Sequence, residues 1–245
     1  MIGNLKNKIR SLVSGFLYAL TKDVIQKVNQ EERTNLLFNE VEKQVYQECA
    51  KFILDNLKTA TAVRGDKWAI RKFAINKVSK GSIILEFGVW TGASYIWFDK
   101  NFSGDVFGFD SFDGLPEEWS GASTPTEKFI LGGKIPERLI KYSKKGLIKV
   151  GWFKDTLPKF LEEHPDKEIA LIHMDADLYS STKYVLETLI ASNKVTKGTI
   201  ILFDNYFGYP GWKFHEHRAV EELLKDRFEY IGYGGGARCV IRIIN

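Results

Sequence analysis

From residue 82 onward, short apolar runs alternate with stretches long enough for a helix, and this rhythm constrains the fold more than any other feature. Each run is bounded by Gly, Asp, Asn or Pro, as strands usually are. The predicted strands cover residues 82–87, 105–109, 147–150, 169–174, 199–203, 228–233 and 238–244. Because the runs are almost continuous in Val, Ile, Leu and Phe, the strands should be buried on both faces. The sequence therefore predicts an α/β fold with a mostly parallel sheet between helices.

The last two predicted strands are separated only by the turn Gly234-Gly235-Gly236. Parallel neighbours need a crossover of a dozen or more residues, so these two strands should form an antiparallel hairpin. We expect a Rossmann-like, seven-stranded, mostly parallel sheet with one antiparallel strand.

The first third of the chain has the periodicity of helices. One helix is predicted from a set of apolar residues at helical spacing, a second covers residues 31–58, and a third covers residues 67–78. The apolar set of the first helix is Ile9, Leu12, Val13, Phe16, Leu17, Leu20, Val24 and Val28. We expect residues 1–79 to form a helical N-terminal extension that acts as a cap or in oligomerisation, and residues 80–245 to form the α/β domain.

The first helix allows three interpretations. Lys6, Lys8 and Arg10 precede an apolar stretch, as in a secretory signal, but no small-residue cleavage site follows. A helix lying on a membrane surface is the second. We favour the third, packing against the protein or a second subunit, which predicts a homo-oligomer joined through the N-terminal helices and no membrane partner. No segment has the ~20 apolar residues of a membrane span.

The charged residues and cysteines exclude other classes. The net charge of +4 arises from 35 basic and 31 acidic residues spread along the chain, so we expect no nucleic-acid partner. Cys49 and Cys239 lie far apart without a further Cys or His at metal-ligand spacing, which predicts neither a disulfide framework nor a zinc site. A cytoplasmic location fits this usage.

A strand, a glycine-containing turn and a helix follow one another in residues 85–94. Gly88 would allow a sharp turn and close approach to a ligand, and the helix opening near Gly92 and Ser94 would present amide groups. Asp110 ends the next strand, 22 residues after Gly88, where an acid can accept ribose hydroxyls. The spacing Glu86-x-Gly88-x-x-x-Gly92 differs from G-x-G-x-x-G, which disfavours NAD and FAD. Glu86 suits a ligand with an ammonium and a sulfonium group. The alternative is glycines that serve turn geometry alone.

Oxygen-bearing side chains follow two further strands. Asp175 comes after the strand at 169–174, and Asp204 and Asn205 come after the strand at 199–203. Oxygen ligands without thiolates favour Mg²⁺, with Mn²⁺ or Ca²⁺ behind it. The alternative is that these side chains cap the following helices, and for Asp177 a cap on the helix near Ser180 is the stronger interpretation.

Together these motifs resemble the macrocin O-methyltransferase family and, more distantly, catechol O-methyltransferase. The resemblance covers residues 80–224 and rests on five segments: LEFGVWTG at 85–92, GFDSFDGLP at 108–116, GWFKDTLP at 151–158, MDADLY at 174–179 and FDNY at 203–206. It implies a class I methyltransferase fold, S-adenosylmethionine as methyl donor and an O-methyltransferase activity.

The resemblance also implies roles for individual residues. The cofactor's methionine part would face Glu86, Gly88, Gly92 and Ser94, in a turn that also contains Trp90 and Thr91. Asp110 and Ser111 would bind the ribose, and Trp152, Phe153 and Asp155 would lie on the adenine side. Asp175, Asp204 and Asn205 match the family's magnesium ligands. Where catechol enzymes have a Lys after the first metal ligand this chain has Leu178, so their general base does not carry over.

Methyl transfer requires an acceptor oxygen in line with the sulfonium methyl group and a means of removing its proton. A cation held by Asp175, Asp204 and Asn205 would do both by chelating two hydroxyls of a sugar. As bases we consider His215 and His217, which begin a helix at the same end of the sheet, whereas His173 inside a strand is better explained as a core histidine. The aperiodic stretch between Phe112 and Leu139 is a candidate lid or substrate loop.

We therefore expect a sugar, free or nucleotide-activated, as the small-molecule acceptor, in a polysaccharide or secondary-metabolite pathway. Two alternatives are a methyltransferase acting on catechol-like acceptors and a non-catalytic S-adenosylmethionine-binding scaffold. A nicotinamide oxidoreductase is a third, which the glycine spacing disfavours.

Overall fold

The structure is a computed structural model that describes residues 2–79, 81–143 and 147–245. The chain divides into two compact units, Met1–Val45 and Tyr46–Asn245. The division therefore falls at residue 45, whereas the sequence places the boundary after residue 79. The reason is packing, because Cys49, Leu57, Ile70 and Ala74 are buried in the second unit.

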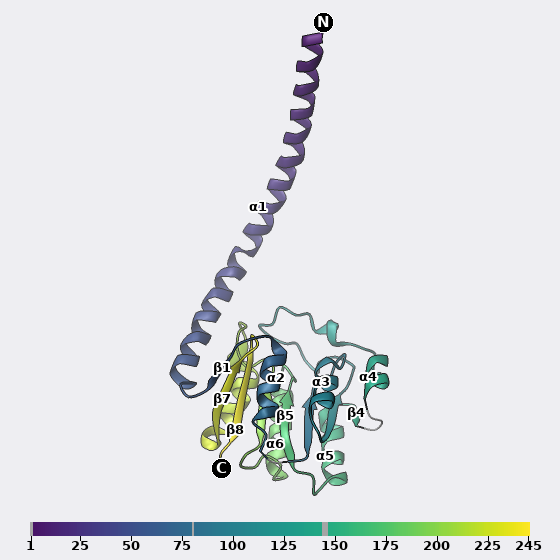
Figure 1. Ribbon diagram of the computed structural model, residues 1–245, viewed down its shortest axis with the longest axis vertical. Coiled ribbons are helices and arrows are strands. Elements are labelled where there is room, and N and C mark those ends of the chain that lie inside the picture. Colours follow the sequence, from purple (N-terminus) through teal and green to yellow (C-terminus); the bar gives the residue numbers. More distant parts are fainter. Residues whose placement is uncertain (1, 80, 144–146) are drawn as a thin grey trace. The chain divides into compact units, whose positions relative to one another are not determined.

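An eight-stranded sheet in the order β1-β7-β8-β6-β5-β2-β3-β4 forms the centre of the second unit (Figure 1). Its strands are β1 (Thr61–Val63), β2 (Ile83–Phe87), β3 (Asp105–Asp110), β4 (Ile148–Val150), β5 (Ile169–Met174), β6 (Ile200–Phe203), β7 (Phe228–Gly234) and β8 (Arg238–Ile243). Among the described residues, only β8 runs antiparallel to its neighbours. The α/β class, the seven expected strands and the hairpin are confirmed, and β1 adds an eighth strand at the edge.

Helices cover both faces of this sheet. They are α2 (Lys67–Asn76), α3 (Ala93–Asn101), α4 (Glu137–Tyr142), α5 (Phe153–Glu163), α6 (Tyr179–Ala191) and α7 (Glu216–Leu223), with 3₁₀ turns η1 (Thr126–Phe129), η2 (Trp212–Phe214) and η3 (Lys225–Arg227). In Figure 1, α2 and α3 lie on one face and α5 and α6 on the other. The stacked rings of Trp68 and Trp97, 5.9 Å apart, join α2 to α3.

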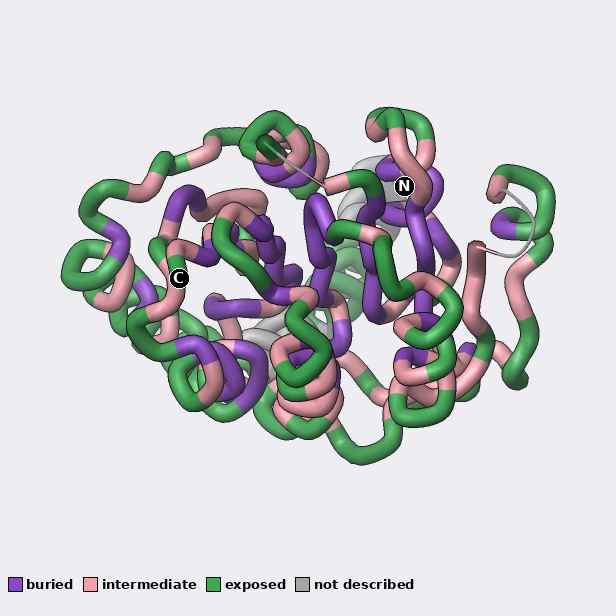
Figure 2. The backbone as a smooth tube through the Cα atoms, turned by 90° about the horizontal axis from the view of Figure 1, so that it is seen from below, coloured by how far each residue is buried: buried purple, intermediate pink, exposed green. Residues whose placement is uncertain are grey.

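The central strands form the core because both their faces are covered. Every residue of β2, β5 and β6 is buried, and Figure 2 shows these buried segments in the middle of the unit. This explains why their sequences are nearly continuous in apolar residues rather than alternating.

Helix α1 (Ile2–Asn56) is one continuous helix where the sequence predicts two. Phe16, Leu17 and Leu20 of the expected apolar face are exposed, while the side chains of Ile9, Leu12 and Val28 lie outside the described residues. Among the described residues, no helix is long and apolar enough to cross a membrane.

Two isoleucines test the position of the core. Ile201 in β6 is fully buried, whereas Ile140 in α4 is 67% exposed. We expect Ile201→Ala to lower the free energy of unfolding by about 2–5 kcal/mol, because the cavity left behind cannot close completely. Ile140→Ala should change it by less than about 0.5 kcal/mol. Urea unfolding followed by circular dichroism measures both, and equal losses would contradict this core.

Candidate active site

A cavity of about 590 Å³ opens at the carboxyl ends of β2, β3, β5 and β6. Its wall is formed by the segments that follow these strands and by α2, the start of α5, β8 and the connection after β3. The residues that follow the strands and line it are Gly88, Val89, Trp90, Thr91, Ala93, Ser94, Asp110, Ser111, Asp175, Ala176, Asp177, Asp204 and Asn205. This is the edge of a doubly wound sheet at which ligands usually bind.

The turn after β2 requires its first glycine. Gly88 has φ +89°, and a Cβ atom there would lie 1.9 Å from the carbonyl oxygen of Asp175. Asp110 holds the rest of the turn, because its Oδ2 accepts hydrogen bonds of 2.7 Å from the backbone N–H groups of Val89 and Trp90. The turn and the end of β3 are thereby joined before any ligand is considered.

Most of the expected cofactor residues meet at this cavity. Those that line it are Gly88, Trp90, Thr91, Ser94, Asp110, Ser111, Trp152 and Phe153, and those that do not are Glu86, Gly92 and Asp155. Gly92 has φ +80° and faces the side chain of Leu139, so its role is to let α3 start beside α4. Asp155 is exposed on the first turn of α5.

Glu86 is completely buried just behind the cavity wall. Its Oε1 accepts a hydrogen bond of 2.5 Å from the Ser94 hydroxyl and lies 3.2 Å from Nδ1 of His173. Its Oε2 has no hydrogen-bond partner among the described residues. A buried carboxylate oxygen without a donor is costly, and a cationic ligand group near Ser94 would remove that cost.

Three side chains meet at the ends of β5 and β6. The Asn205 amide donates to Oδ1 of Asp177 over 2.7 Å and lies 3.4 Å from Oδ1 of Asp175. Burial, and then repulsion from Asp204, raises the pKa of Asp175 to about 7. Burial, and then the charge of Asp175, raises the pKa of Asp177 well above its usual value. The two carboxyl groups thus repel each other.

Asp177 does not cap a helix. Helix α6 begins at Tyr179, and its N-cap is Leu178 without a side-chain hydrogen bond. The residue has a left-handed backbone with φ +60°, and its side chain lies in the cavity wall instead.

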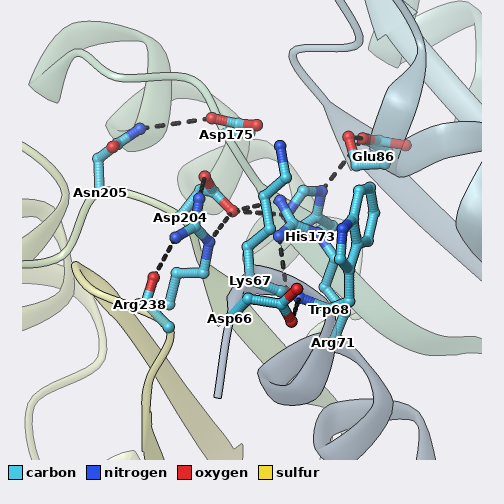
Figure 3. Close-up of polar contacts among 12 residues, drawn as sticks. Asp66, Lys67, Trp68, Arg71, Glu86, His173, Asp175, Asp204, Asn205 and Arg238 are labelled. Carbon is cyan, nitrogen blue, oxygen red and sulfur yellow. Dashed lines mark hydrogen bonds and ion pairs between the residues drawn. The ribbon is translucent and has the colours of Figure 1, made fainter.

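Asp204 binds two arginines (Figure 3). Arg71 of α2 donates to Oδ1 over 2.5 Å, and Arg238 of β8 donates to Oδ1 and Oδ2 over 2.7 and 2.6 Å. His173 Nε2 lies 3.3 Å from the same Oδ1. Burial alone would raise the pKa of Asp204, but the hydrogen bond to His173 and the charges of Arg71 and Arg238 hold it well below its usual value.

The acidic cluster suits a divalent cation. One ligand atom each of His173, Asp175 and Asp204 lies within 4.8 Å of the others, and the Asn205 amide is next to Asp175. Burial, and after it the charges of neighbouring carboxylates, raises the pKa values of Asp175 and Asp177, so a bound cation would favour their ionised forms. Oxygen-rich, electronegative donor sets of this kind fit Mg²⁺ or Mn²⁺.

The two histidines expected as bases lie elsewhere, since neither lines the cavity. His215 Nε2 is 2.9 Å from the carbonyl oxygen of Ser120. The His217 ring packs against the rings of Phe52 and Trp212, and its Nδ1 is 3.1 Å from the Tyr206 hydroxyl. Burial lowers the pKa of His217 to about 4.

Arg71 and Arg238 are absent from the expected site, although both had a signal in the sequence. Arg238 begins the strand whose next residue, Cys239, pairs with Phe203, so it lies opposite Asp204. Arg71 follows Ile70 on the buried side of α2, where an arginine needs a partner. The connection after β3, expected as a lid or substrate loop, contributes Gly114, Leu115, Pro116, Trp119, Thr124, Lys128 and Phe129 to the cavity wall.

A mostly parallel sheet whose one antiparallel strand, β8, is the third from its edge, a glycine turn after β2 and an acid at the end of β3 define a class I methyltransferase. The chain belongs to the macrocin O-methyltransferase (TylF) family, whose model matches residues 63–229. The family and the fold expected from the motifs are confirmed.

One curated relative and two solved structures are similar to the chain. The relative is the 8-demethyl-8-(2,3-dimethoxy-alpha-L-rhamnosyl)-tetracenomycin-C 4'-O-methyltransferase of Streptomyces olivaceus, 30% identical over 142 residues, which are 50% of this chain and 52% of the relative. The chain thus spans about half the length of that relative.

Both structures are of CalS11. The first, a calicheamicin methyltransferase, has a TM-score of 0.59 and 23% identity and covers 83% of this chain and 91% of that one. The second, an apo structure named as a TDP-rhamnose 3'-O-methyltransferase, has a TM-score of 0.50 and 21% identity and covers 83% and 93%. At this identity the likeness supports the fold.

The close approach at Gly88 gives a stability prediction. We expect Gly88→Ala to reduce the free energy of unfolding by at least about 2 kcal/mol more than Gly132→Ala, measured by urea unfolding. Gly132 is the control because it also has a positive φ, +69°, but has nothing within 4 Å of a Cβ atom. Equal losses would mean that backbone conformation alone accounts for the effect.

The raised pKa of Asp175 gives a pH prediction for the metal-free protein. Its pKa is about 7 in the folded state, against an ordinary value of 3.8. The contribution of the protonated Asp175 carboxyl to the free energy of unfolding is therefore fully present below pH 4 and is lost as the pH rises through 7. Asp175→Asn should therefore be more stable than the unmodified protein at pH 8 by roughly 1–3 kcal/mol, and equally stable at pH 4.

Urea unfolding in EDTA at both pH values measures this difference. Asp166→Asn serves as the control, because Asp166 is exposed. A difference that does not depend on pH would contradict the prediction.

Proposed function

We propose that the chain is an S-adenosylmethionine-dependent O-methyltransferase that methylates a hydroxyl group of a sugar in secondary-metabolite biosynthesis. The observation that carries the proposal is the single cavity that joins the glycine turn and Asp110 to Asp175 and Asn205. Membership of the macrocin O-methyltransferase family and the name of the tetracenomycin relative support it.

The cofactor would lie along the turn after β2. Its ammonium group would approach Ser94 and the unpartnered oxygen of Glu86, and its ribose would lie beside Asp110 and Ser111, which line the same wall. Trp152 and Phe153 at the start of α5 would contact the adenine. The sulfonium carries positive charge, so the acidic end of the cavity favours the charged cofactor over its neutral product.

A divalent cation, Mg²⁺ or Mn²⁺, would be held by Asp175, Asp204 and Asn205. When bound, such a cation lowers the pKa of a coordinated hydroxyl and orients two neighbouring sugar oxygens. Asp204 would share its carboxylate between the cation and the two arginines, which keep it ionised.

Asp177 is the residue we assign to remove the acceptor proton. It lines the cavity between the cofactor turn and Asn205, and its raised pKa makes it a stronger base than an ordinary carboxylate. His215 and His217 are less suited to this role, because neither lines the cavity and they contact Ser120 and the Phe52 ring respectively.

We extend the proposal to a nucleotide-linked sugar as acceptor. Lys67, Lys128 and Lys154 line the cavity and could pair with a diphosphate, and the indole rings of Trp90 and Trp119 line the same wall. The name of CalS11 as a TDP-rhamnose 3'-O-methyltransferase supports the same acceptor class.

Two variants separate the proposed roles. Asp175→Asn should abolish Mn²⁺ binding and lower kcat by roughly 10²-fold or more, because the cation is lost. Asp177→Asn should retain Mn²⁺ and S-adenosylmethionine binding but lower kcat by roughly 10²–10⁴-fold. Calorimetry measures binding, and transfer of a labelled methyl group to a panel of nucleotide-linked sugars and catechols measures turnover.

Asp166→Asn, at an exposed residue, is the control. It should leave Mn²⁺ binding, S-adenosylmethionine binding and kcat unchanged. Turnover of catechols alone would contradict a sugar acceptor, and cofactor binding without turnover of any acceptor would favour a scaffold. Full activity of Asp175→Asn would exclude the metal site.

A further inference from the structure

Several apolar side chains of α1 that the structure describes are exposed. Val13, Leu17, Leu20, Val24, Phe38 and Val41 are each between 38% and 65% exposed. A single helix with this much exposed apolar surface is marginal in water and gains most of its stability from packing against a partner. The question is which partner its sequence fits.

These apolar residues belong to one series in which the spacing alternates between four and three residues. The complete series is Val13, Leu17, Leu20, Val24, Lys27, Glu31, Thr34, Phe38, Val41 and Val45. Such a spacing is that of a two-stranded coiled coil, in which the repeating residues face the partner helix. The series is apolar at both ends and polar in the middle.

The series is also symmetric about residue 29. If a second copy of α1 is laid alongside in the opposite direction, Val13 faces Val45, Leu17 faces Val41 and Leu20 faces Phe38. At the centre Lys27 of each copy faces Glu31 of the other. In a parallel pair, Lys27 would face Lys27 and Glu31 would face Glu31, which buries like charges together.

The distribution of charge along α1 also favours the antiparallel arrangement. Residues 1–28 contain five Lys and Arg residues and one Asp, whereas residues 29–45 contain four Glu and two basic residues. An antiparallel pair places the basic half of each copy beside the acidic half of the other. This complementarity favours a second copy over an anionic lipid surface, which would attract the first half and repel the second.

We propose that α1 is a dimerisation helix, which pairs with α1 of a second copy of this chain as an antiparallel coiled coil over residues 13–45. The pair is centred on two Lys27–Glu31 contacts, and these polar contacts fix its register and direction.

Engineered cysteines test the direction of the pair in the full-length protein. Leu20→Cys protein mixed with Phe38→Cys protein should form disulfide-linked dimers under mild oxidation, whereas Leu20→Cys alone should not. In the antiparallel pair the two Leu20 positions are about 27 Å apart, because 18 residues of helix separate each from the other's partner position. The native Cys49 and Cys239 are buried, so they do not compete.

Charge reversal tests the register without touching the apolar residues. Lys27→Glu and Glu31→Lys should each raise the dimer dissociation constant roughly tenfold or more, because each creates like-charge contacts, and the double variant should restore it. Light scattering and sedimentation equilibrium measure the constant. Thermal unfolding monitored by circular dichroism serves as the folding control.

Three results would overturn the proposal. The first is disulfide-linked dimers of Leu20→Cys protein alone, which would indicate a parallel pair, and the second is a double charge variant whose dimer dissociation constant is not restored. The third is a protein that is monomeric at tens of micromolar and instead sediments with phosphatidylglycerol vesicles.

Discussion

The buried ionic chain from Glu86 through His173 to Asp204 and its two arginines connects the parts on which the site depends. It crosses the carboxyl ends of β2, β5 and β6 and reaches α2 through Arg71 and β8 through Arg238. Burying these groups is costly, and only their mutual pairing offsets the cost, so removal of one partner leaves an uncompensated charge. These ionic contacts therefore hold α2 and the β7–β8 hairpin beside the cavity. They also connect Glu86, near the cofactor turn, to Asp204, at the acidic end of the cavity.

Beside this paired chain stands a set of acids that the arginines do not balance. Asp175 and Asp177 have raised pKa values because burial, and then repulsion from neighbouring carboxylates, opposes their ionisation. Asp204 differs because the hydrogen bond to His173 and the charges of Arg71 and Arg238 lower its pKa. One cavity thus contains a carboxylate whose pKa is lowered, Asp204, and two carboxyl groups whose pKa values are raised, Asp175 and Asp177. Asp204 is suited to binding positively charged groups. Asp175 and Asp177 are suited to binding a cation or accepting a proton.

The strands and the positions of the strand-end acids could be predicted because both follow local rules. A strand buried on both faces needs a continuous apolar run, and the residue after a parallel strand must lie at the ligand edge. Gly88, Asp110 and Asp175 follow these rules and line the cavity, while their roles stay predictions. Strand β1 could not be found, since its three residues are largely exposed and form no apolar run.

Side-chain direction is what sequence spacing could not supply. The order of the chain puts His217 at the correct end of the sheet, but the 3₁₀ turn η2 and the first turn of α7 rotate its ring into contact with Phe52 and Trp212. Asp177 shows the opposite case, a residue expected as a helix cap whose side chain lies in the cavity wall. A left-handed backbone and a hydrogen bond from the Asn205 amide hold it there. A side chain that its backbone and a hydrogen bond both hold can keep a fixed geometry more closely than one held by neither. The same reasoning makes the connection after β3 the part of the wall in which acceptor specificity can change while the chemistry stays in place.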